Sequence, residues 1–165
     1  MNSGVREENH RFYTLVLDLD ETLVHFDQRK RSYRARPYAA NFIKEMSKHF
    51  ELVIFTAGLK EYADWILDDF DKYRYISHRL YRNSCRFRKG VYVKDLSRIG
   101  RDLSRTIIVD NIAENYELQA DNGINIASWF NSYQDIELQK LEPILRMMVE
   151  TKVTDVRDTL KQYLK

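Results

Sequence analysis

The chain has very little of the residues that define several special classes of protein. Its 165 residues include one cysteine, two prolines and five glycines. A single cysteine excludes a disulfide framework and a cysteine-rich zinc site, and it favours a reducing compartment. So little proline and glycine excludes collagen-like and low-complexity chains. No apolar run approaches the roughly 20 residues that cross a bilayer, and the polar start shows no signal-peptide pattern. These absences predict an intracellular protein without a membrane segment.

What is present suits one globular domain. Apolar residues make up 44% of the chain and charged residues 32%, an ordinary mixture for a soluble domain. At this length the chain can bury roughly 70% of its unfolded surface. We expect a polar N-terminal tail over residues 1–12 and a single domain over residues 13–165.

The small net charge of +2 hides an uneven distribution. Residues 72–105 contain eleven basic and two acidic residues, a net charge of +9, so the remainder carries −7. Such patches favour an anionic partner, whether nucleic acid, a phosphopeptide or a lipid headgroup. A solvated surface paired with acidic neighbours explains them equally well at this point. A second basic cluster comprises Arg29, Lys30, Arg31, Arg34 and Arg36.

Apolar runs alternate with helical patterns along the chain, which predicts an α/β domain with a mainly parallel sheet. Pro37 is expected in the first turn of a helix that reaches about His49, and Pro143 is expected to kink or break a later helix. A hairpin is expected where 85–87 and 91–93 flank the turn 88–90. Buried strands are predicted at 14–17, 52–55, 107–109 and 125–127, strand pieces at 75–76 and 80–81, and helices from about 60, at 134–149 and at 154–164.

Ligands of such sheets bind beyond the carboxyl ends of the strands, so residues directly after the strands are the candidates for chemistry. Asp18 and Asp20 follow the first strand, and alternation would turn both carboxylates to one side. Crowded carboxylates favour a divalent cation, and one of them can act as a nucleophile. A lone D-x-D pattern is also typical of a capping turn.

Other strand ends carry compatible groups. Thr56 precedes Gly58, which permits close approach of the backbone to an anion, while Lys94 could meet a phosphate. Asp110 and Asn111 follow the third strand and offer oxygen ligands for Mg²⁺. Each residue taken alone fits a turn or a surface position as well. Together they supply a nucleophile, an acid/base group, a metal site, a hydroxyl and a lysine, which are the parts needed for phosphoryl transfer.

The sequence also resembles a known family. The stretch Asp18-Leu19-Asp20-Glu21-Thr22-Leu23-Val24-His25 is similar to the D-x-D-x-[TV] signature of the haloacid dehalogenase superfamily. It resembles more narrowly the small phosphatases that act on the C-terminal domain of RNA polymerase II. The likeness runs from about Thr14 to the C-terminus. It continues through Phe55-Thr56-Ala57-Gly58, Tyr62-Ala63-Asp64, Arg79-Leu80-Tyr81-Arg82-Asn83-Ser84-Cys85, Tyr92-Val93-Lys94-Asp95-Leu96-Ser97-Arg98, Gly100-Arg101-Asp102-Leu103, Val109-Asp110-Asn111 and Ala127-Ser128-Trp129-Phe130.

The resemblance implies a fold and a chemistry. The fold would be haloacid-dehalogenase-like and Rossmannoid, with a mainly parallel sheet, flanking helices, a small hairpin insertion near 75–94 and no large cap domain. Asp18 would attack phosphorus, and Asp20 would protonate the leaving oxygen and later activate water. Mg²⁺ would be held by Asp18, the Asp20 carbonyl, Asn111 and Asp110, the last directly or through water. The phosphoryl oxygens would be bound by Thr56, Arg82 and Lys94.

One segment departs from this pattern. The small C-terminal-domain phosphatases have a longer stretch before the Arg-Pro pair, with apolar strand residues that form a pocket for a substrate proline. Here only the ten residues 26–35 intervene, four of them basic. We expect the apolar pocket to be absent or rebuilt, so specificity for the polymerase tail does not follow. A basic rim would instead favour acidic or multiply phosphorylated substrates.

The sequence and its resemblance together predict a Mg²⁺-dependent protein serine/threonine phosphatase that forms an aspartyl-phosphate. A monomer that acts on phosphoproteins in the nucleus or cytoplasm, without direct nucleic-acid binding, is expected. Cys85 lacks the arginine six positions later that a cysteine phosphatase needs, and no P-loop pattern occurs. Two alternatives remain: the same mechanism on a small-molecule or lipid-linked phosphate, and a non-catalytic binding scaffold of the same fold. The intact carboxylates of Asp18 and Asp20 argue against the scaffold.

Overall fold

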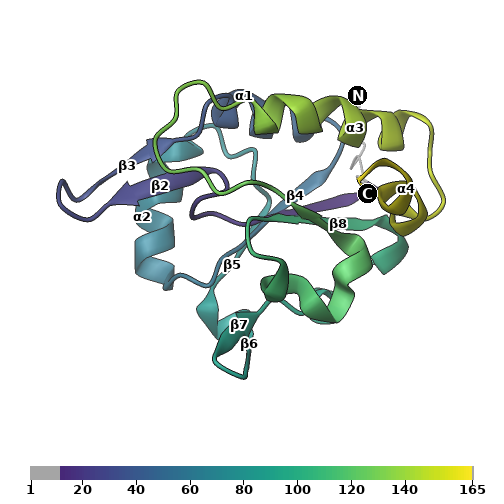
Figure 1. Cartoon of the computed structure of the whole chain (residues 1–165), viewed down its shortest axis with the longest axis horizontal. Helices are drawn as coiled ribbons and strands as arrows, with labels where there is room; N and C mark the ends of the chain where they lie inside the picture. The colour runs from purple at the N-terminus through teal and green to yellow at the C-terminus, as the bar shows by residue number, and fades with distance from the viewer. Residues whose placement is uncertain (1–11, 165) are drawn as a thin grey trace, which may run out of the picture.

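A five-stranded sheet forms the centre of the molecule (Figure 1). The structure is a computed structural model and describes residues 12–164. Each pair of neighbouring strands in this sheet is parallel, which confirms the predicted sheet type. In order across the sheet, the strands are β5 (His78–Leu80), β4 (Glu51–Phe55), β1 (Thr14–Leu17), β8 (Thr106–Asp110) and β9 (Gly123–Asn125).

The α-helices pack on one face of this sheet. Leu15 and Leu17 of β1 belong to the main hydrophobic core, whereas Val16 between them belongs to a second, smaller core. This division follows from the alternation of side chains along a strand. Figure 1 shows α1 and α3 side by side over the sheet. The helices are α1 (Ala39–Met46), α2 (Lys60–Phe70), α3 (Glu137–Glu150) and α4 (Val156–Tyr163).

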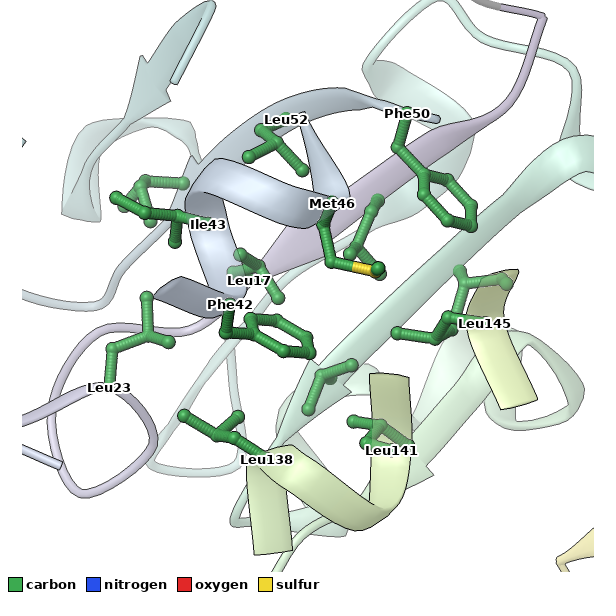
Figure 2. Close-up of a cluster of buried hydrophobic side chains, with 14 of the residues drawn as sticks. Leu17, Leu23, Phe42, Ile43, Met46, Phe50, Leu52, Leu138, Leu141 and Leu145 are labelled. Atoms are coloured by element: carbon green, nitrogen blue, oxygen red, sulfur yellow. The ribbon is translucent and has the colours of Figure 1, made fainter. Parts of the chain in front are cut away.

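The main core joins α1, α3 and the sheet (Figure 2). Phe42 and Met46 of α1 point toward Leu138 and Leu145 of α3, and Leu17 closes the cluster from the sheet. All five side chains are fully buried. Full burial of such a side chain contributes about 1.5–3 kcal/mol, so this layer fixes how the helices lie on the strands.

The second face of the sheet is covered by short segments. Val16 and Ile108 pack there with Leu96 and Tyr116. The predicted hairpin lies beside them as β6 (Arg86–Arg88) and β7 (Val91–Val93), which confirms that prediction. Its turn has positive φ at Lys89 and Gly90, as two-residue hairpin loops require. Single 3₁₀ turns occupy Arg82–Ser84, Leu96–Arg98 and Leu103–Arg105, and a longer 3₁₀ stretch spans Ala113–Asn122.

A second hairpin, β2 (Val24–Asp27) and β3 (Ser32–Ala35), was not predicted from the sequence. It projects from the left side of the molecule in Figure 1, next to α2. Val24 and Phe26 alternate with polar residues in β2, as Tyr33 and Ala35 do in β3, but each strand has only four residues, which is too short for a clear strand signal in the sequence.

Several predicted boundaries are wrong. The 75–76 strand piece is absent, because Asp71 accepts hydrogen bonds from the backbone N–H groups of Tyr75 and Ile76 and removes them from pairing. The strand expected at 125–127 runs instead over Gly123–Asn125. Helix α1 begins at Ala39, after the left-handed residue Tyr38, so Pro37 lies outside it.

The expected break at Pro143 does not occur, because α3 continues through it from Glu137 to Glu150. Pro143 cannot donate to the carbonyl of Gln139, but both residues are exposed, so water can satisfy that oxygen. Leu141 and Leu145 remain buried on either side of the proline and hold the two halves of the helix against the core.

The predicted tail, residues 1–12, lies outside the described residues except for Phe12. Among residues 12–164, no helix has both the length and the apolar character needed to cross a bilayer.

Candidate active site

The predicted strand-end residues lie together at the carboxyl edge of the sheet. The last residue of β1 is in register with Ile54 of β4 and Val109 of β8. Asp18 therefore leaves the sheet between these neighbours, and its backbone N–H donates a 3.0 Å hydrogen bond to the carbonyl of Val109. Asp110 ends β8 and Thr56 directly follows β4. The topology thus gathers side chains that lie up to 92 positions apart in the sequence.

A buried lysine bridges two of these carboxylates. Lys94 follows β7, and its Nζ lies 2.7 Å from Oδ1 of Asp18 and 2.5 Å from Oδ2 of Asp110. The lysine side chain is 0% exposed, so the carboxylates rather than water stabilise its charge. Burial alone would lower the pKa of Lys94, but Asp18 and Asp110 outweigh it and raise that pKa. The ammonium group therefore stays charged at neutral pH.

Asp110 sits in the most enclosed part of this group. Burial and the nearby charge of Asp18 raise the pKa of Asp110 to about 6, although Lys94 opposes the shift. The Asp110 carboxylate also accepts hydrogen bonds from the backbone N–H of Ile112 at 3.0 Å and from Nδ2 of Asn115 at 3.2 Å. A second positive charge nearby would relieve the crowding of the two carboxylates. Asn115 was not predicted as a site residue, because no motif in the sequence marks it.

Thr22 and Asn111 complete the surroundings of Asp18. The hydroxyl of Thr22 donates to Oδ2 of Asp18 at 2.9 Å and lies 3.3 Å from Oδ1 of Asn111. The amide nitrogen of Asn111 donates to Ser128 at 2.9 Å, which turns the amide oxygen toward the carboxylate. Thr22 is not among the predicted site residues, although the T of the D-x-D-x-[TV] signature is a signal in the sequence that identifies it.

Asp20 lies at the same edge but has a different partner. Its carboxylate accepts a hydrogen bond from the hydroxyl of Tyr62 in the first turns of α2. Burial raises the pKa of Asp20, the Tyr62 hydrogen bond opposes this, and the charge of Asp18 adds to the increase. A carboxyl group with a raised pKa is suited to give and take a proton. Tyr62 was missed as a site residue, because its partner lies 42 positions away.

A cleft opens beside Asp20. It has a volume of about 410 Å³ and is lined by Asp20, Tyr62, Arg82 and the turn 57–59. Arg82 is fixed to this turn, because its Nε donates to the carbonyl of Ala57 at 2.7 Å. The hydroxyl of Thr56 accepts a 2.9 Å hydrogen bond from the backbone N–H of Gly58. Arg82 and Asp20 therefore meet at one opening, and Thr56 is buried next to the turn that forms part of its lining.

The oxygen atoms around Asp18 suit a magnesium ion. Within residues 12–164, no three His, Cys, Asp or Glu side chains are grouped to hold a metal by themselves. Magnesium does not require such a group, because it commonly takes one or two carboxylates and keeps several waters. The donors on hand are hard oxygens, as Mg²⁺ prefers: the carboxylates of Asp18 and Asp110 and the amide of Asn111. With the raised pKa of Asp110, this donor set fits the ion.

The arrangement provides the groups that a phosphoryl transfer needs. Asp18 offers a carboxylate with 6% exposure, and the charge of Asp18 reaches Asp20, whose pKa is raised. Lys94 and the Thr56 hydroxyl supply positive charge and a hydrogen-bond donor at the same edge. Such preorganised groups stabilise charge that develops on transferred oxygens.

Comparison with known proteins identifies relatives for this site. The family model described as NLI interacting factor-like phosphatase matches residues 13–157. A probable C-terminal domain small phosphatase of Dictyostelium discoideum is 44% identical, and the match covers 90% of this chain and 54% of that protein. The human carboxy-terminal domain RNA polymerase II polypeptide A small phosphatase 1 is 39% identical, with 90% and 63% covered. The chain therefore spans little more than half the length of these relatives.

Solved structures share the fold. The fission yeast RNA polymerase II CTD phosphatase Fcp1 aligns with a TM-score of 0.59 at 18% identity, over 92% of this chain and 54% of the other. A putative beta-phosphoglucomutase from Thermotoga maritima aligns with a TM-score of 0.53 at 9% identity, over 79% and 91%. At these identities the likeness concerns the fold alone, and it confirms the predicted haloacid-dehalogenase-like architecture.

Proposed function

The chain belongs to the NLI interacting factor-like phosphatase family, and from this premise we propose that it is a Mg²⁺-dependent phosphoprotein phosphatase. The observation that supports this most directly is the buried lysine between two carboxylates at the carboxyl ends of β1 and β8. A structural ion pair would need one carboxylate, whereas a second one beside it is costly unless it serves a cation or a reaction.

Asp18 attacks the phosphorus atom in line with the leaving oxygen and forms an aspartyl-phosphate. Asp20 donates its proton to the leaving oxygen, which departs as the hydroxyl of serine or threonine. Asp20 then takes a proton from a water molecule that attacks the phosphorus of the aspartyl-phosphate, so that the bond to Asp18 breaks and inorganic phosphate leaves. Both carboxyl groups thereby return to their starting states. The raised pKa of Asp20, caused mainly by its burial, supports this acid/base role.

The other side chains bind and orient the phosphoryl group. Lys94 is proposed to neutralise its oxygens, with hydrogen bonds from Thr56 and the guanidinium of Arg82. The hydrogen bond from Arg82 to Ala57 keeps that guanidinium at the mouth of the cleft. Asp18, Asp110, Asn111 and the Asp20 carbonyl would hold Mg²⁺. When bound, the ion supplies charge stabilisation for the transferred oxygens.

The proposed substrate is a phosphoserine or phosphothreonine in a protein. No large cap covers the cleft in the described part of the chain, and an open site suits a protein segment better than an enclosed metabolite. We further propose that the catalytic domain spans residues 13–165 with a small insertion near 75–94. It would act as a monomer in the nucleus or cytoplasm.

Hydrolysis of a generic aryl phosphate tests the reaction itself. The protein should be active with Mg²⁺ and inactive with EDTA, and activity should return when Mg²⁺ is added back. Asp18→Asn and Asp20→Asn should each lower kcat by at least about 100-fold. Asp158→Asn is the matched control, because Asp158 is exposed on α4. Activity that persists in Asp18→Asn would overturn the nucleophile, and full activity in EDTA would overturn the metal.

A further inference from the structure

The β2–β3 hairpin carries a cluster of unpaired cations. The four residues Arg29, Lys30, Arg31 and Arg34 are all exposed. None of them forms an ion pair with any of residues 12–164, whereas four of the eight arginines of residues 72–105 have acidic partners, such as Asp64, Asp95 or Glu51. We define these four residues as the hairpin cations.

The acidic residue of the hairpin, Asp27, offsets only part of their charge, since one carboxylate faces four cations. Asp27 accepts hydrogen bonds from the backbone N–H groups of Arg29 at 3.0 Å and Lys30 at 3.2 Å. Its carboxylate therefore shapes the turn, and the side chains of the basic residues project into solvent. The hairpin cations thus retain most of their charge for another molecule.

The hairpin is attached to the active site by aromatic contacts. Phe26 of β2 packs edge-on against Tyr62, with ring centroids 5.5 Å apart, and Tyr62 hydrogen-bonds the carboxylate of Asp20. Phe26 and Tyr33 each pack edge-on against Trp65 of α2, with ring centroids 6.1 Å apart in both pairs. A peptide that places its phosphate at Asp18 can therefore continue over this surface toward the turn.

The base of the hairpin is held firmly. Arg36, which follows β3, is 1% exposed and makes two 2.8 Å hydrogen bonds to Asp135. Arg36 also donates a 3.2 Å hydrogen bond to the backbone carbonyl of Thr22, the residue whose hydroxyl contacts Asp18. These contacts fix the position of the hairpin relative to the site. A preordered surface of this kind binds a substrate at a smaller entropic cost.

The geometry sets a distance as well. Asp20 forms a bridge with Val24, the first residue of β2. Bridged residues lie about 4.8 Å apart, and a strand rises about 3.3 Å per residue. Going from Asp20 across to Val24 and then along β2 therefore places the turn about 15 Å from Asp20. An extended peptide covers this distance in about four or five residues.

We propose that the hairpin cations bind acidic side chains of the substrate. Arg29, Lys30 and Arg31 at the turn would bind those about four or five residues from the phosphorylated residue, and Arg34, which pairs with His25, would bind one nearer to it. This inference rests on the proposed phosphatase function and names the class of its substrate: proteins with a phosphoserine or phosphothreonine next to an acidic or multiply phosphorylated stretch. Aspartate, glutamate and phosphate groups complement the arginines directly. The surface is continuous with the catalytic cleft, which favours a flanking substrate segment over a nucleic acid or a membrane.

Phosphopeptides test the proposal. One set carries acidic residues four and five positions before the phosphoserine, a second carries them after it, and a third has glutamine in their place. Each kcat/KM is divided by the same protein's rate on the aryl phosphate, so that a general loss of catalysis cancels. The wild type should prefer one acidic set about tenfold, and this preference should weaken as ionic strength rises.

The variant Arg29→Glu/Lys30→Glu/Arg34→Glu should abolish the preference. It leaves Arg31 unchanged, because Arg31 has a left-handed backbone with φ 46°. Arg29→Gln/Lys30→Gln/Arg34→Gln should reduce the preference and serves if the charge reversal fails to fold.

The matched control is Lys44→Glu/Lys48→Glu/Lys72→Glu, which changes the net charge equally. Lys44 lies in the last turn of α1, and Lys48 and Lys72 follow α1 and α2; all three lysines are exposed and lie at the opposite edge of the sheet. The control should keep the preference. Equal loss in the control, or no acidic preference in an active wild type, would overturn the proposal and leave the phosphatase function standing. An inactive wild type on aryl phosphate would instead overturn the function.

Binding gives a readout that does not depend on turnover. Fluorescence anisotropy with the Asp18→Asn protein should show about tenfold tighter binding of the preferred acidic phosphopeptide than of its glutamine counterpart. The hairpin charge reversal in that background should remove the difference. Tighter binding of a single-stranded oligonucleotide or of phosphatidylserine vesicles than of the acidic peptide, lost in the same variant, would overturn the assignment to a peptide.

Discussion

The ammonium group of Lys94 lies 2.7 Å from the carboxylate of Asp18, directly after strand β1, and 2.5 Å from that of Asp110, the last residue of strand β8. Neither the lysine nor Asp110 has any exposed side-chain surface. Two buried carboxylates repel each other unless a cation lies between them. The Lys94 ammonium group supplies this cation, so the stability of the protein and its proposed function both depend on the contacts of Lys94 with Asp18 and Asp110.

Replacing Lys94 with methionine should lower both the stability of the protein and its activity. Two buried carboxylates would face each other without compensation, which costs about 3–5 kcal/mol of the free energy of unfolding. Activity on aryl phosphate should fall at least about 100-fold. Because Mg²⁺ can replace part of the missing charge, it should raise the Tm of Lys94→Met more than that of the wild type. Thermal unfolding with and without the ion measures this.

Lys72→Met is the control for that experiment, because Lys72 is exposed. An unchanged Tm in Lys94→Met, or equal Mg²⁺ effects on variant and wild type, would contradict the bridging role.

Gly58 is expected to be required for the shape of the cleft. An added Cβ would lie 3.1 Å from the Thr56 hydroxyl and 3.1 Å from the Tyr62 ring, closer than ordinary contacts. Gly58→Ala should displace one of these groups and lower kcat/KM on aryl phosphate about tenfold, with less than about 2 kcal/mol lost in stability. Steady-state kinetics with urea unfolding would separate the two effects.

Gly100→Ala provides the opposite control. Gly100 has φ 71° and open space around its Cα, so alanine should cost about 1 kcal/mol of stability through the backbone alone. Its activity at moderate temperature should match the wild type. If Gly58→Ala retains full activity, the cleft is more adaptable than its contacts imply.

The ion pair of Arg36 and Asp135 should be strongly coupled. Two 2.8 Å hydrogen bonds join side chains 99 positions apart. Arg36→Met and Asp135→Asn should each lower the free energy of unfolding by about 2–4 kcal/mol, because each leaves the other charged group without its partner. The double variant should lose less than the sum of the two single losses. Arg36→Lys should restore little, because lysine cannot form the two-pronged contact. Purely additive losses in urea unfolding would show that the pair does not act as a unit.

Stability should depend on the ionisation of Asp64. Burial alone would raise the pKa of Asp64, but hydrogen bonds from Lys60, Tyr81 and Arg79 lower it to about 2 from 3.8. A lowered folded-state pKa adds stability above pH 4, and this stability is lost as pH falls from about 4 to about 2. Asp64→Asn should therefore be less stable than the wild type by about 1–2 kcal/mol at pH 7, allowing for partial exposure.

Urea unfolding at pH 7, 4 and 2.5 measures that difference. It should shrink steadily below pH 4 as the wild-type carboxylate becomes neutral. A difference that stays constant over this range would assign the effect of Asp64→Asn to packing instead of charge.

The sequence predicted the sheet and its reactive edge well. Short apolar runs such as 14–17 and 107–109 are typical of buried strands, and the residues after them leave a parallel sheet at its carboxyl edge. That reasoning places Asp18, Thr56 and Asp110 near one another from the sequence alone. It fails where local pattern carries little information: the short strands of the β2–β3 hairpin, the turn at Asp71 and the continuation of α3 through Pro143.

The sequence by itself determined the kind of chemistry, because side-chain types and their distance from the strand ends are local properties. Only the tertiary structure decided which side chains contact one another in the site. Tyr62 meets Asp20, Lys94 enters between Asp18 and Asp110, and the hairpin stands beside the cleft because packed elements bring together residues far apart in the chain. Such contacts depend on burial and register across the whole core, which no window of sequence contains.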